Sequence, residues 1–598
     1  MKDLVALDIE VFPNYFLLVI KRLNDGKTII FDTTSKLASS ERAKIYKILR
    51  RHTSFGFNSI NYDMPLINHM LSGGNAASAY TISKNIVEKG LPFFMTYNRY
   101  NINQRPFDHF DIKEPSPAVM ISLKNYGTRI GSKKLQDLPF EPNKRVNKEQ
   151  IDVLKEYCIN DVDVTIDLYN AIKDRIALRV EMGKRYDMDL RSKSDAQIAE
   201  AVITSELQKA GVNINRPTYK DGYTATYIAP SYISFNRPEL KKILDLVQKA
   251  KYPLAANGAV QLPKELKNYK VTIGNTTYKL GIGGLHSQEK KLVVESNDKY
   301  VMRNADFTSY YPFIIINNGL YPKHLSRRFL NVYHKIVMER LKAKREGNKL
   351  VADSLKIVIN GSFGKFGSKY SALYAPDLLI RTTITGQLTL LMLIERLEDN
   401  GISVVSANTD GLEYYCPRDK VDLAEAIIFD LELISGYEME HGEYNGLYAK
   451  DVNNYVAKYG DKVKAKGIYA ETTLMKGRST PIVYKAIREY IRADVPLERT
   501  ILECDDINEF VAARTVKGGG VFNGEYLGKV VRWYYSLDGG SITYSTNGNL
   551  VPKTSEGNGV KPLMNLPDKL PDDLDYAWYI NEAIAKLNDL GLRYVTTE

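Results

Sequence analysis

An apolar segment near the N-terminus, LVALDIEVF at residues 4–12, carries two acids, Asp8 and Glu10. The segment predicts a buried strand, and because side chains two residues apart lie on the same face of a strand, both carboxylates project together. Burying two such charges is costly unless a cation neutralises them. The pattern therefore favours a strand that holds a metal ion; an edge strand whose acids face water is the alternative.

The following residues predict a sheet around this strand. YFLLVI at 15–20 predicts a second strand, and KTIIFD at 27–32 predicts a third, after the hairpin signal at 24–26. The 598 residues of the chain exceed the ~250–300 at which a single core stops growing, so we expect several domains.

Composition narrows the class of protein. The chain is 44% hydrophobic and 26% charged, as in ordinary globular proteins. Its net charge of +11 favours a polyanionic partner or simply good solubility, and its 41 tyrosines suit stacking on bases. No apolar run approaches ~18 residues, and acids interrupt the N-terminal segment. We therefore expect a cytoplasmic enzyme without a membrane span.

The metal-binding residue types are also restricted. The three cysteines are widely spaced, and the seven histidines include no HxH or HxxxH pair. This excludes a disulfide framework and a cysteine-type zinc site. Any metal must be held by carboxylates, which points to Mg²⁺ or Mn²⁺.

Further acids occur at informative positions. Asp63 follows Asn58 by five residues in GFNSINYDMPLI, in a loop that leads into a helix. Tyr157 and Asp161 lie one turn apart in the predicted helix at 156–172. A phenol placed there can orient a water while the carboxylate binds the metal that activates it.

One more carboxylate, Asp410, lies in SANTDGLEYY at 406–415, at the predicted tip of a hairpin. Asp and Gly both tolerate left-handed backbone angles, so a simple turn explains this segment taken alone.

Three short segments, DIE, NSINYD and YCIND, resemble in order and spacing the motifs of the 3′–5′ exonuclease domain of family B DNA polymerases. The resemblance implies two metal ions bound by Asp8, Glu10 and Asp161. It implies that Asp63 is a further acid of the site and that Tyr157 orients the attacking water.

The same resemblance implies contacts with single-stranded DNA. Asn58 and Tyr62 would touch a frayed 3′ end, and SLKNYG resembles the family's Ser/Thr-Leu element, here Ser122 and Leu123. Lys134 is the candidate for the lysine that supports the scissile phosphate. An ordinary structural loop is the alternative for this element and for Lys134.

RNADFTSYYPFIIINNGLYP at 303–322 resembles the polymerase motif A, DxxSxYP. The resemblance implies that Asp306 binds both catalytic metals, aided by the carbonyl of Phe307. Tyr311 would lie under the nucleotide sugar and exclude a ribonucleotide by steric clash. Ser309 and Tyr310 complete this nucleotide-binding segment, Tyr310 standing where many relatives have leucine.

KIVINGSFGKFG at 356–367 resembles motif B, KxxxNSxYG. Lys356 would pair with the triphosphate, Asn360 would lie one turn away, and Phe363, in place of the usual tyrosine, would pack against the incoming base. Arg340 and Lys344 resemble the fingers pair that holds the γ- and β-phosphates, with a solvated basic helix face as the alternative.

SANTDGLEYY occupies the place of motif C, DTD followed by Ser, which makes Asp410 the second metal ligand and Asn408 and Gly411 departures. Two ions ~4 Å apart need this second carboxylate. Two further segments, the GIGGLHS linker and the region 452–469, imply additional contacts with DNA that their motifs support less strongly. For the lysines of these segments, an exposed basic strand is the alternative. The residues are Gly283, Gly284, Tyr455, Lys464 and Lys466.

The fold class implied is a multidomain α/β (α+β) chain, with an RNase H-like exonuclease domain plus right-hand palm, fingers and thumb. The expected ranges are 1–190 for the exonuclease, 191–325 for the linker and first palm segment, 326–360 for the fingers, 361–470 for the palm with motif C, and 471–598 for the thumb and C-terminal region.

The function implied is a small, phage-type DNA-dependent DNA polymerase with proofreading. It would use two Mg²⁺ (or Mn²⁺) ions per active site, primer–template DNA and dNTPs. A monomer is expected, with a helicase, single-strand-binding or processivity protein as partner. Two alternatives stay open: a 3′–5′ exonuclease with a decayed polymerase module, suggested by Asn408, Gly361 and Gly281, and a non-catalytic single-stranded-DNA-binding scaffold.

Overall fold

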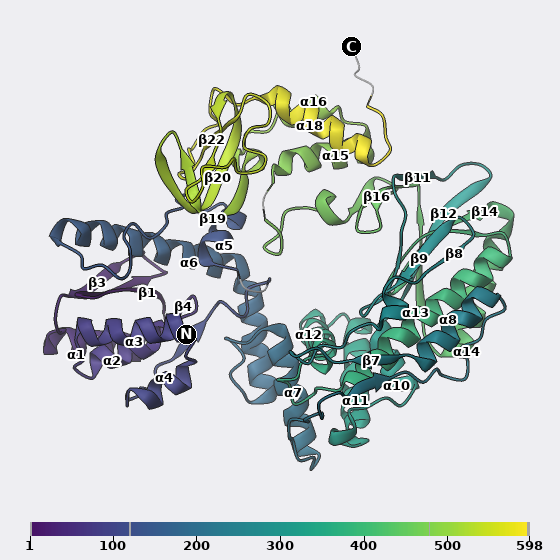
Figure 1. Cartoon of the computed structure of the whole chain (residues 1–598), viewed down its shortest axis with the longest axis horizontal. Helices are drawn as coiled ribbons and strands as arrows, with labels where there is room; N and C mark the ends of the chain where they lie inside the picture. The colour runs from purple at the N-terminus through teal and green to yellow at the C-terminus, as the bar shows by residue number, and fades with distance from the viewer. Residues whose placement is uncertain (1–2, 119–120, 478, 595–598) are drawn as a thin grey trace. The chain divides into compact units, whose positions relative to one another are not determined.

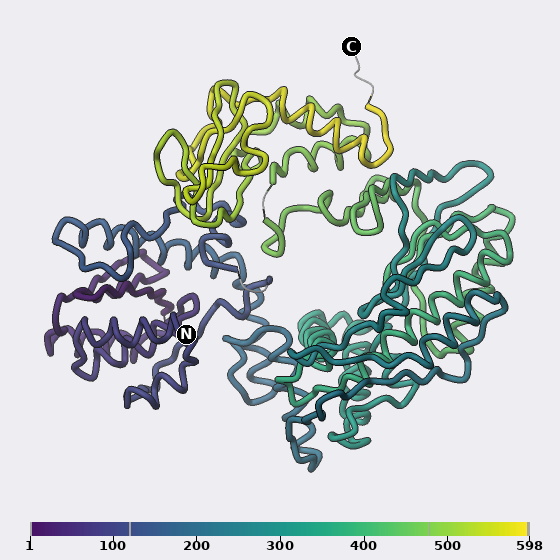
Figure 2. Tube along the Cα trace, in the orientation of Figure 1, coloured from purple at the N-terminus to yellow at the C-terminus, as the bar shows by residue number. Residues whose placement is uncertain are grey.

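The computed structural model describes residues 3–118, 121–477 and 479–594. The chain divides into two compact units (Figures 1 and 2). Unit 1 comprises Met1–Ser194, Thr472–Ile482 and Glu503–Tyr579, and unit 2 comprises Asp195–Glu471, Val483–Leu502 and Ile580–Glu598. Both units mix helices with sheets, so the predicted multidomain α/β (α+β) class is confirmed.

Unit 1 is built on a five-stranded sheet with the order β3-β2-β1-β4-β5. The strands are β1 (Leu4–Phe12), β2 (Tyr15–Arg22), β3 (Thr28–Thr33), β4 (Thr53–Gly56) and β5 (His109–Asp111). The first three pair antiparallel, as the hairpin signals predict, whereas β4 and β5 run parallel to β1. The sheet lies within the range 1–190 for which the motif resemblance implies an exonuclease domain.

Helices cover both faces of this sheet (Figure 1). They are α1 (Ser39–Arg51), α2 (Asp63–Leu71), α3 (Ala76–Lys89), α4 (Phe93–Arg99), α5 (Leu123–Ile130) and α6 (Lys148–Tyr186). Alternate residues of β1 enter two different cores: Leu7 and Ile9 pack with α1–α3, and Ala6 and Phe12 pack with α6. Period-two alternation therefore directs Asp8 to the α6 face.

A C-terminal segment completes unit 1. It contains α17 (Ile507–Phe510) and the sheet β21-β19-β20-β22, formed by β19 (Ala512–Phe522), β20 (Glu525–Gly540), β21 (Thr543–Tyr544) and β22 (Val560–Pro562). The fully buried Arg532 fastens this segment to the loop after α5, because its guanidinium donates to the carbonyls of Ser132, at 2.9 Å, and Lys133, at 3.3 Å. Figure 2 shows the two segments side by side.

Unit 2 is built on a seven-stranded sheet with the order β15-β12-β14-β13-β10-β9-β8. The strands are β8 (Lys270–Ile273), β9 (Thr276–Leu280), β10 (Leu285–Ser287), β12 (Tyr300–Phe307), β13 (Ser403–Asn408), β14 (Gly411–Pro417) and β15 (Met439–Tyr444). Beside it lies the sheet β11-β16-β17-β18, made of β11 (Leu292–Glu295), β16 (Gly446–Asp451), β17 (Asn454–Tyr459) and β18 (Lys462–Ala465). A two-stranded ribbon pairs β6 (Thr224–Thr226) with β7 (Lys251–Pro253).

The following helices lie wholly within unit 2. They are α7 (Asp195–Lys209), α8 (Pro238–Lys249), α9 (Lys264–Lys267), α10 (Tyr310–Asn317), α11 (Arg328–Arg345), α12 (Lys349–Phe366), α13 (Pro376–Asp399), α14 (Val421–Ser435) and α16 (Leu497–Leu502), with single 3₁₀ turns at Lys323–Leu325, Arg418–Lys420 and Gly467–Tyr469. Two more helices, α15 (Pro481–Ala493) and α18 (Tyr576–Asp589), span the unit boundaries.

Helix α13 is the one helix among the described residues that is long and apolar enough to cross a membrane, and 83% of its apolar window is buried inside the protein. It forms the centre of unit 2, where it contacts α10, α14 and β13. We therefore interpret α13 as a core helix. The division into two units does not correspond to the five predicted ranges, whose boundaries stay predictions.

Candidate active sites

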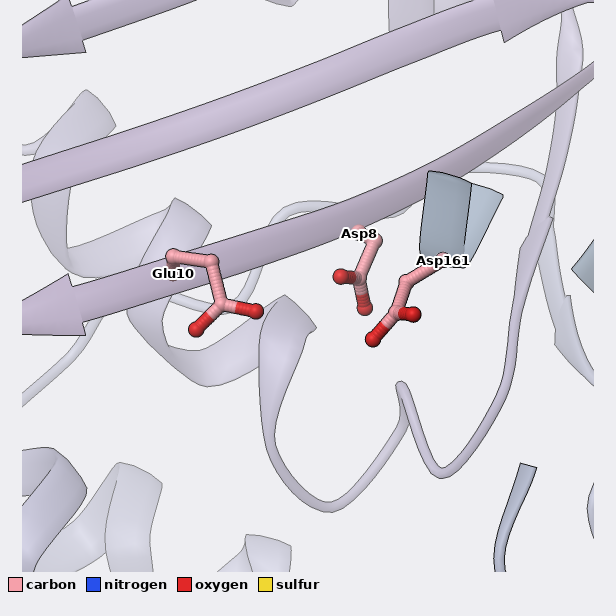
Figure 3. Close-up of side chains that lie close together, drawn as sticks. All are labelled: Asp8, Glu10 and Asp161. Carbon is pink, nitrogen blue, oxygen red and sulfur yellow. The ribbon is translucent and has the colours of Figure 1, made fainter. Parts of the chain in front are cut away.

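The first candidate site lies in unit 1, between β1 and α6. Asp8, Glu10 and Asp161 each offer an oxygen, and these three oxygens all lie within 4.8 Å of one another (Figure 3). Asp8 and Glu10 project from the same face of β1, as their spacing predicts, and Asp161 faces them from α6. The structure thus brings together three residues that the sequence separates by up to 153 positions.

These carboxyl groups repel one another in a buried place. Burial and the Asp161 charge raise the pKa of Asp8 to about 7. Burial and the Asp8 charge raise the pKa of Glu10 and of Asp63 well above their ordinary values. In addition, Oδ1 of Asp63 is buried without a hydrogen-bond partner. Oxygen ligands whose negative charge is not neutralised by the protein suit a divalent cation. These residues therefore fit the Mg²⁺ or Mn²⁺ that the motifs imply.

A lysine that the sequence reasoning missed faces the same cluster. The ammonium of Lys124 donates to both carboxylate oxygens of Asp161, at 2.8 Å each, and to the phenol oxygen of Tyr157, at 2.6 Å. Its charge also lowers the pKa values of Asp8 and Glu10, although burial outweighs it. Lys124 lies within the SLKNYG element, and that position was the available signal.

Helix α5 places this lysine. Ser122 is its N-cap, and the Ser122 hydroxyl accepts a bond from the Asn125 amide, so Lys124 falls in the first turn. Leu123 packs against the α6 core. Lys134 instead forms a backbone bridge with Asn565. No described contact brings it to the acids, so its assigned role stays a prediction.

The loop that carries Asn58 and Tyr62 is held by Asp111. Both oxygens of this carboxylate accept backbone amides, from Asn58 at 2.9 Å and from Ile60 at 3.1 Å. The side chain of Asn58 accepts from Lys113 at 2.9 Å, and Asn58 has φ of 61°, a conformation that asparagine tolerates. The Tyr62 hydroxyl meets that of Ser83 at 2.7 Å. The backbone of this loop is therefore fixed before any ligand arrives.

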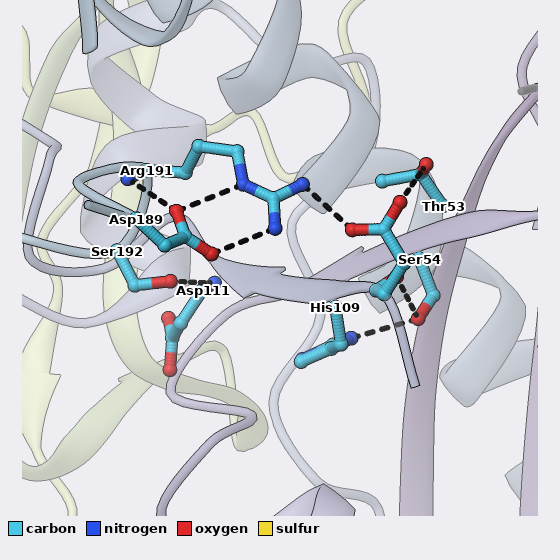
Figure 4. Close-up of polar contacts among 8 residues, drawn as sticks. Thr53, Ser54, His109, Asp111, Asp189, Arg191 and Ser192 are labelled. Atoms are coloured by element: carbon cyan, nitrogen blue, oxygen red, sulfur yellow. Dashed lines mark hydrogen bonds and ion pairs between the residues drawn. The ribbon is translucent and has the colours of Figure 1, made fainter. Parts of the chain in front are cut away.

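A polar network supports Asp111 from behind (Figure 4). The Asp111 amide donates to Ser192 at 2.9 Å, and the neighbouring Arg191 pairs with Asp189 and Asp108. His109 lies between the hydroxyls of Ser54 and Ser59, and burial lowers its pKa to about 3. The imidazole is therefore neutral, and its role is structural.

The second candidate site lies in unit 2, where motif A and motif C meet. Asp306 lies near the end of β12, and its Cα partner on β14 is Gly411, the residue after Asp410. The Phe307 amide donates to the Asp410 carbonyl at 2.7 Å. Burial and the Asp306 charge raise the pKa of Asp410. The hairpin tip therefore does deliver Asp410 to the strand end that carries Asp306.

Residue 411 has to be glycine for this approach. A Cβ built there would lie 1.8 Å from Oδ1 of Asp306. The same carboxylate accepts a bond at 2.8 Å from the side chain of Asn304, two residues earlier on the same strand face. Gly411, a departure from the family pattern, thus has a steric reason in this chain.

The predicted phosphate-binding residues approach motif A from α11. Arg340 donates to the hydroxyl of Ser309 at 2.8 Å, and Lys344 pairs with Glu440 at 3.2 Å. Glu440 is the Cα partner of Asp306 on β15. Arg340 therefore contacts motif A at Ser309, and Lys344 contacts the strand partner of Asp306, although Lys344 is largely exposed.

Aromatic rings of motif A and motif B pack against one another in the second site. Tyr311 stacks on Phe363, with ring centres 4.5 Å apart, and its hydroxyl donates to the Gly283 carbonyl. Tyr310 is turned away: its ring stacks on Phe307 at 4.0 Å and its hydroxyl donates to the Gly386 carbonyl. Motif A and motif B thus meet through Tyr311 and Phe363, while Tyr310 belongs to the core.

Helix α12 presents the remaining motif B residues. Lys356 and Asn360 are exposed and one turn apart, as predicted, and Phe363 follows at the next turn. All three therefore share the helix face that reaches Tyr311.

The departures that suggested a decayed module have structural reasons. A Cβ on Gly361 would lie 2.5 Å from the Asp195 carbonyl oxygen, where α12 packs on α7. A Cβ on Gly281 would lie 2.8 Å from the Gly284 carbonyl oxygen, in a turn that Gln387 holds by two hydrogen bonds.

Asn408 stands where motif C has an acid, and Asn453 stands where the resemblance of the region 452–469 implies a lysine. The side-chain amides of the two residues meet at 3.5 Å. The chain therefore lacks one charge of each sign at the same place, and the local charge balance is kept.

The residues predicted to make the weaker DNA contacts also lie near the second site. A Cβ on Gly284 would lie 2.6 Å from the Thr409 hydroxyl oxygen, so this linker lies against the motif C tip. Burial lowers the pKa of Lys464, but Tyr444 and Asp306 outweigh it and the pKa is raised. The charge of Lys466 acts on Asp410, and burial followed by acidic neighbours raises the pKa of Tyr455.

Comparisons with known proteins agree with the motifs. No family model matches the chain. It is 28% identical to DNA polymerase 1 of Sulfolobus acidocaldarius over 137 residues, and 28% identical to DNA polymerase 1 of Saccharolobus solfataricus over 167 residues. These matches cover 22% and 26% of this chain, and the chain spans only 15% and 18% of the two archaeal proteins.

Two further matches are a short mitochondrial protein and a solved structure. An uncharacterized mitochondrial protein of Marchantia polymorpha is 38% identical over 76 residues, which are 13% of this chain and 96% of that protein. The solved structure of the family B DNA polymerase from Pyrobaculum calidifontis aligns with all of this chain and 79% of its own, at 14% identity and a TM-score of 0.41. The chain is similar to family B DNA polymerases, as its motifs indicate.

Proposed function

We propose that the protein is a DNA-dependent DNA polymerase that extends a primer 3′-hydroxyl with dNTPs and proofreads with a 3′–5′ exonuclease. The observation that carries the proposal is the pairing of β12 with the hairpin β13–β14, which brings Asp410 to Asp306. Distant carboxylates that meet at a strand end, beside basic and aromatic residues of two helices, form a site for a nucleoside triphosphate and metal ions.

In the polymerase site, Asp306, Asp410 and the Phe307 carbonyl would hold two divalent ions. Such ions lower the pKa of the attacking 3′-oxygen and neutralise charge on the leaving pyrophosphate. The chain's own contribution is positioning. Lys356, with the α11 pair Arg340 and Lys344, binds the triphosphate and answers the charge that develops on it.

Substrate selection follows from the stacked pair. The Phe363 face accepts the incoming base, and the Tyr311 ring fills the space under the sugar. Because the Tyr311 hydroxyl is tied to the Gly283 carbonyl, the ring is held in place and cannot swing away from a 2′-hydroxyl. This arrangement supports a preference for deoxynucleotides.

In the exonuclease site, Asp8, Glu10 and Asp161 would hold the metal ions that supply an activated water. Tyr157 orients this water, and the loop that carries Asn58 and Tyr62 receives the unpaired 3′ end. Lys124, bonded to Tyr157 and Asp161, would place a positive charge beside the scissile phosphate. We assign to Lys124 the role that the motif resemblance implied for Lys134.

The two alternatives predict different behaviour. A nuclease with a decayed polymerase module would degrade DNA but not extend a primer, and Gly361, Gly281 and Gly411 speak against it because each has a packing reason. A binding scaffold would do neither. It leaves the converging carboxylates of both sites unexplained, because an unneutralised buried acid cluster destabilises a fold.

Primer extension tests the proposal. Wild type, Asp410→Ala and Asp8→Ala are compared with a primed template, Mg²⁺ and dNTPs, and degradation is followed on the same DNA without dNTPs. We expect Asp410→Ala to lose more than about 100-fold in synthesis while degradation persists, because a metal ligand is missing. Asp8→Ala should do the reverse. Exposed acids of the same units, Asp419→Ala and Glu88→Ala, serve as controls.

Loss of both activities in either variant would contradict two separate sites. Absence of synthesis in the wild type, with degradation intact, would favour the decayed module.

We further infer that the enzyme serves DNA replication in a phage or mobile element. Copying of a singly primed circle beyond one lap would show whether it needs a helicase or processivity partner.

A further inference from the structure

A pocket of about 370 Å³ lies in unit 2, and its lining includes none of the residues assigned to either site. Three segments line it: 217–223, 320–324 and the first turns of α13. The volume is within the range of small-ligand sites, roughly 300–1,000 Å³. The proposed polymerase and nuclease reactions make no use of it.

Tyrosine rings form one side of the pocket. Tyr219 lies 4.5 Å from Tyr223, centre to centre, and meets Tyr374 edge-on at 5.3 Å, so its position is fixed by two neighbours. Tyr321 lines the pocket from another segment. Rings held in this way offer flat surfaces on which an aromatic ligand can stack.

The lining of the pocket carries two cations, Arg381 and Lys323, and one carboxylate. Its acid, Asp377, already accepts the Tyr223 hydroxyl and the Thr226 amide, the latter at 3.0 Å. Arg381, one turn further along α13, has its Nε buried without a hydrogen-bond partner. Lys323 is exposed at the rim. Arg381 as a whole is only partly buried and lines the pocket, so its positive charge is within reach of an anion bound there.

We propose that this pocket binds a nucleotide, with its base against Tyr219 and Tyr321 and its phosphate at Arg381 and Lys323. An aromatic ring joined to an anion matches both halves of the lining. Base stacking and a phosphate contact do not read base edges, so binding is tolerant of sequence. The inference goes beyond the proposed function, because neither a primer nor synthesis is required.

The nucleotide can come from single-stranded DNA or from solution, and the two sources are separated by experiment. The full-length protein is irradiated in EDTA with an oligothymidylate that carries one 4-thiothymidine, or with free 4-thiothymidine monophosphate, and the cross-linked residues are mapped by mass spectrometry. We expect cross-links at Tyr219, Tyr223 or Tyr321. Cross-links from both probes indicate a site for free nucleotide; from the oligonucleotide alone, a site for a strand.

Variants test the contacts. Arg381→Gln should lower the cross-link yield in the pocket at least about 5-fold, since a charge-assisted phosphate contact is lost, and Arg381→Lys should restore part of it. Because Nε has no partner to lose, the fold should persist, which circular dichroism checks. Lys335→Gln, an exposed lysine of α11, is the matched control.

Unchanged yield with Arg381→Gln, or no cross-link in the pocket with either probe, would overturn the inference. So would binding of a proline-rich peptide in the pocket in place of both probes. An enzyme that failed to extend primers but lost pocket cross-links with Arg381→Gln would contradict the proposed function and leave this inference standing.

Discussion

The two acidic sites use the same residue types in opposite settings. In unit 1 the three carboxylates lie close together and are partly buried, and Lys124 is bonded to one of them. In unit 2 Asp306 and Asp410 lie at a strand end and a hairpin tip, and the cations around them are more exposed. In the nuclease site, a metal ion must therefore relieve the mutual repulsion of the carboxylates. The polymerase site instead depends on the close approach of the Gly411 backbone to the Asp306 carboxylate.

The largest expected effect is on that backbone approach. Gly411→Ala places a Cβ 1.8 Å from the Asp306 carboxylate, so the carboxylate or the hairpin must move. A displacement of about 1 Å can cost roughly 100-fold in rate. We expect primer extension to fall by about that factor while degradation is unchanged. Equal synthesis by Gly411→Ala and wild type would show that the polymerase site does not depend on this close approach.

The next effect is on the nuclease site. Lys124→Met removes the ammonium that contacts Asp161 and Tyr157, and we expect degradation to fall roughly 10- to 100-fold, as when one charge-stabilising donor is lost. Lys134→Met is the matched control and should stay within about 2-fold, because it lacks a described contact to the acids. If Lys134→Met had the larger effect, the original sequence assignment would be right and ours wrong.

A smaller effect concerns sugar selection in unit 2. Tyr311→Val keeps an apolar residue but removes the ring that fills the space under the sugar. We expect ribonucleotide incorporation relative to deoxynucleotide to rise by roughly 10-fold or more, measured as the ratio of the two kcat/KM values. Tyr310→Phe, which alters a buried neighbour, should leave this ratio unchanged. A ratio unaffected by Tyr311→Val would remove its selective role.

The smallest effect is on stability. The folded-state pKa of Asp8 is raised to about 7 by burial and by Asp161. Its contribution is therefore full below the unfolded-state pKa and is lost as pH rises through about 7. In EDTA, we expect the melting temperature of wild type to fall relative to Asp8→Asn by about 2–5 °C between pH 5 and pH 8.

Mg²⁺ should reverse this trend for wild type only, because it binds the ionised carboxylates. Thermal unfolding at both pH values, with and without Mg²⁺, provides the measurement. Parallel pH profiles for the two proteins in EDTA would show that the acids of unit 1 do not repel one another as described.

Local periodicity was enough to predict the carboxylates. Alternation along β1 put Asp8 and Glu10 on one face, and helical spacing put Tyr157 above Asp161. The turn chemistry of Asn-Thr-Asp-Gly put Asp410 at a hairpin tip. In each case the relation joins neighbours in sequence, and the family resemblance supplied the long-range pairing.

Packing between distant segments could not be predicted in this way. Lys124 reaches Asp161 only because α5 lies against α6, and Asp111 holds the Asn58 loop only because β5 joins the sheet beside β4. Likewise, the fully buried Arg532 ties a C-terminal strand to the loop after α5, about 400 residues earlier. No pattern within a short window encodes such contacts.

The most direct test of the central claim is to look for metal between Asp306 and Asp410. A crystal of the protein with primer–template DNA, a non-hydrolysable dNTP and Mn²⁺ would show manganese by its anomalous scattering. We expect two peaks, both bound by Asp306 and at least one by Asp410, and their loss in Asp410→Ala. DNA and nucleotide bound with no peak at these carboxylates would contradict it.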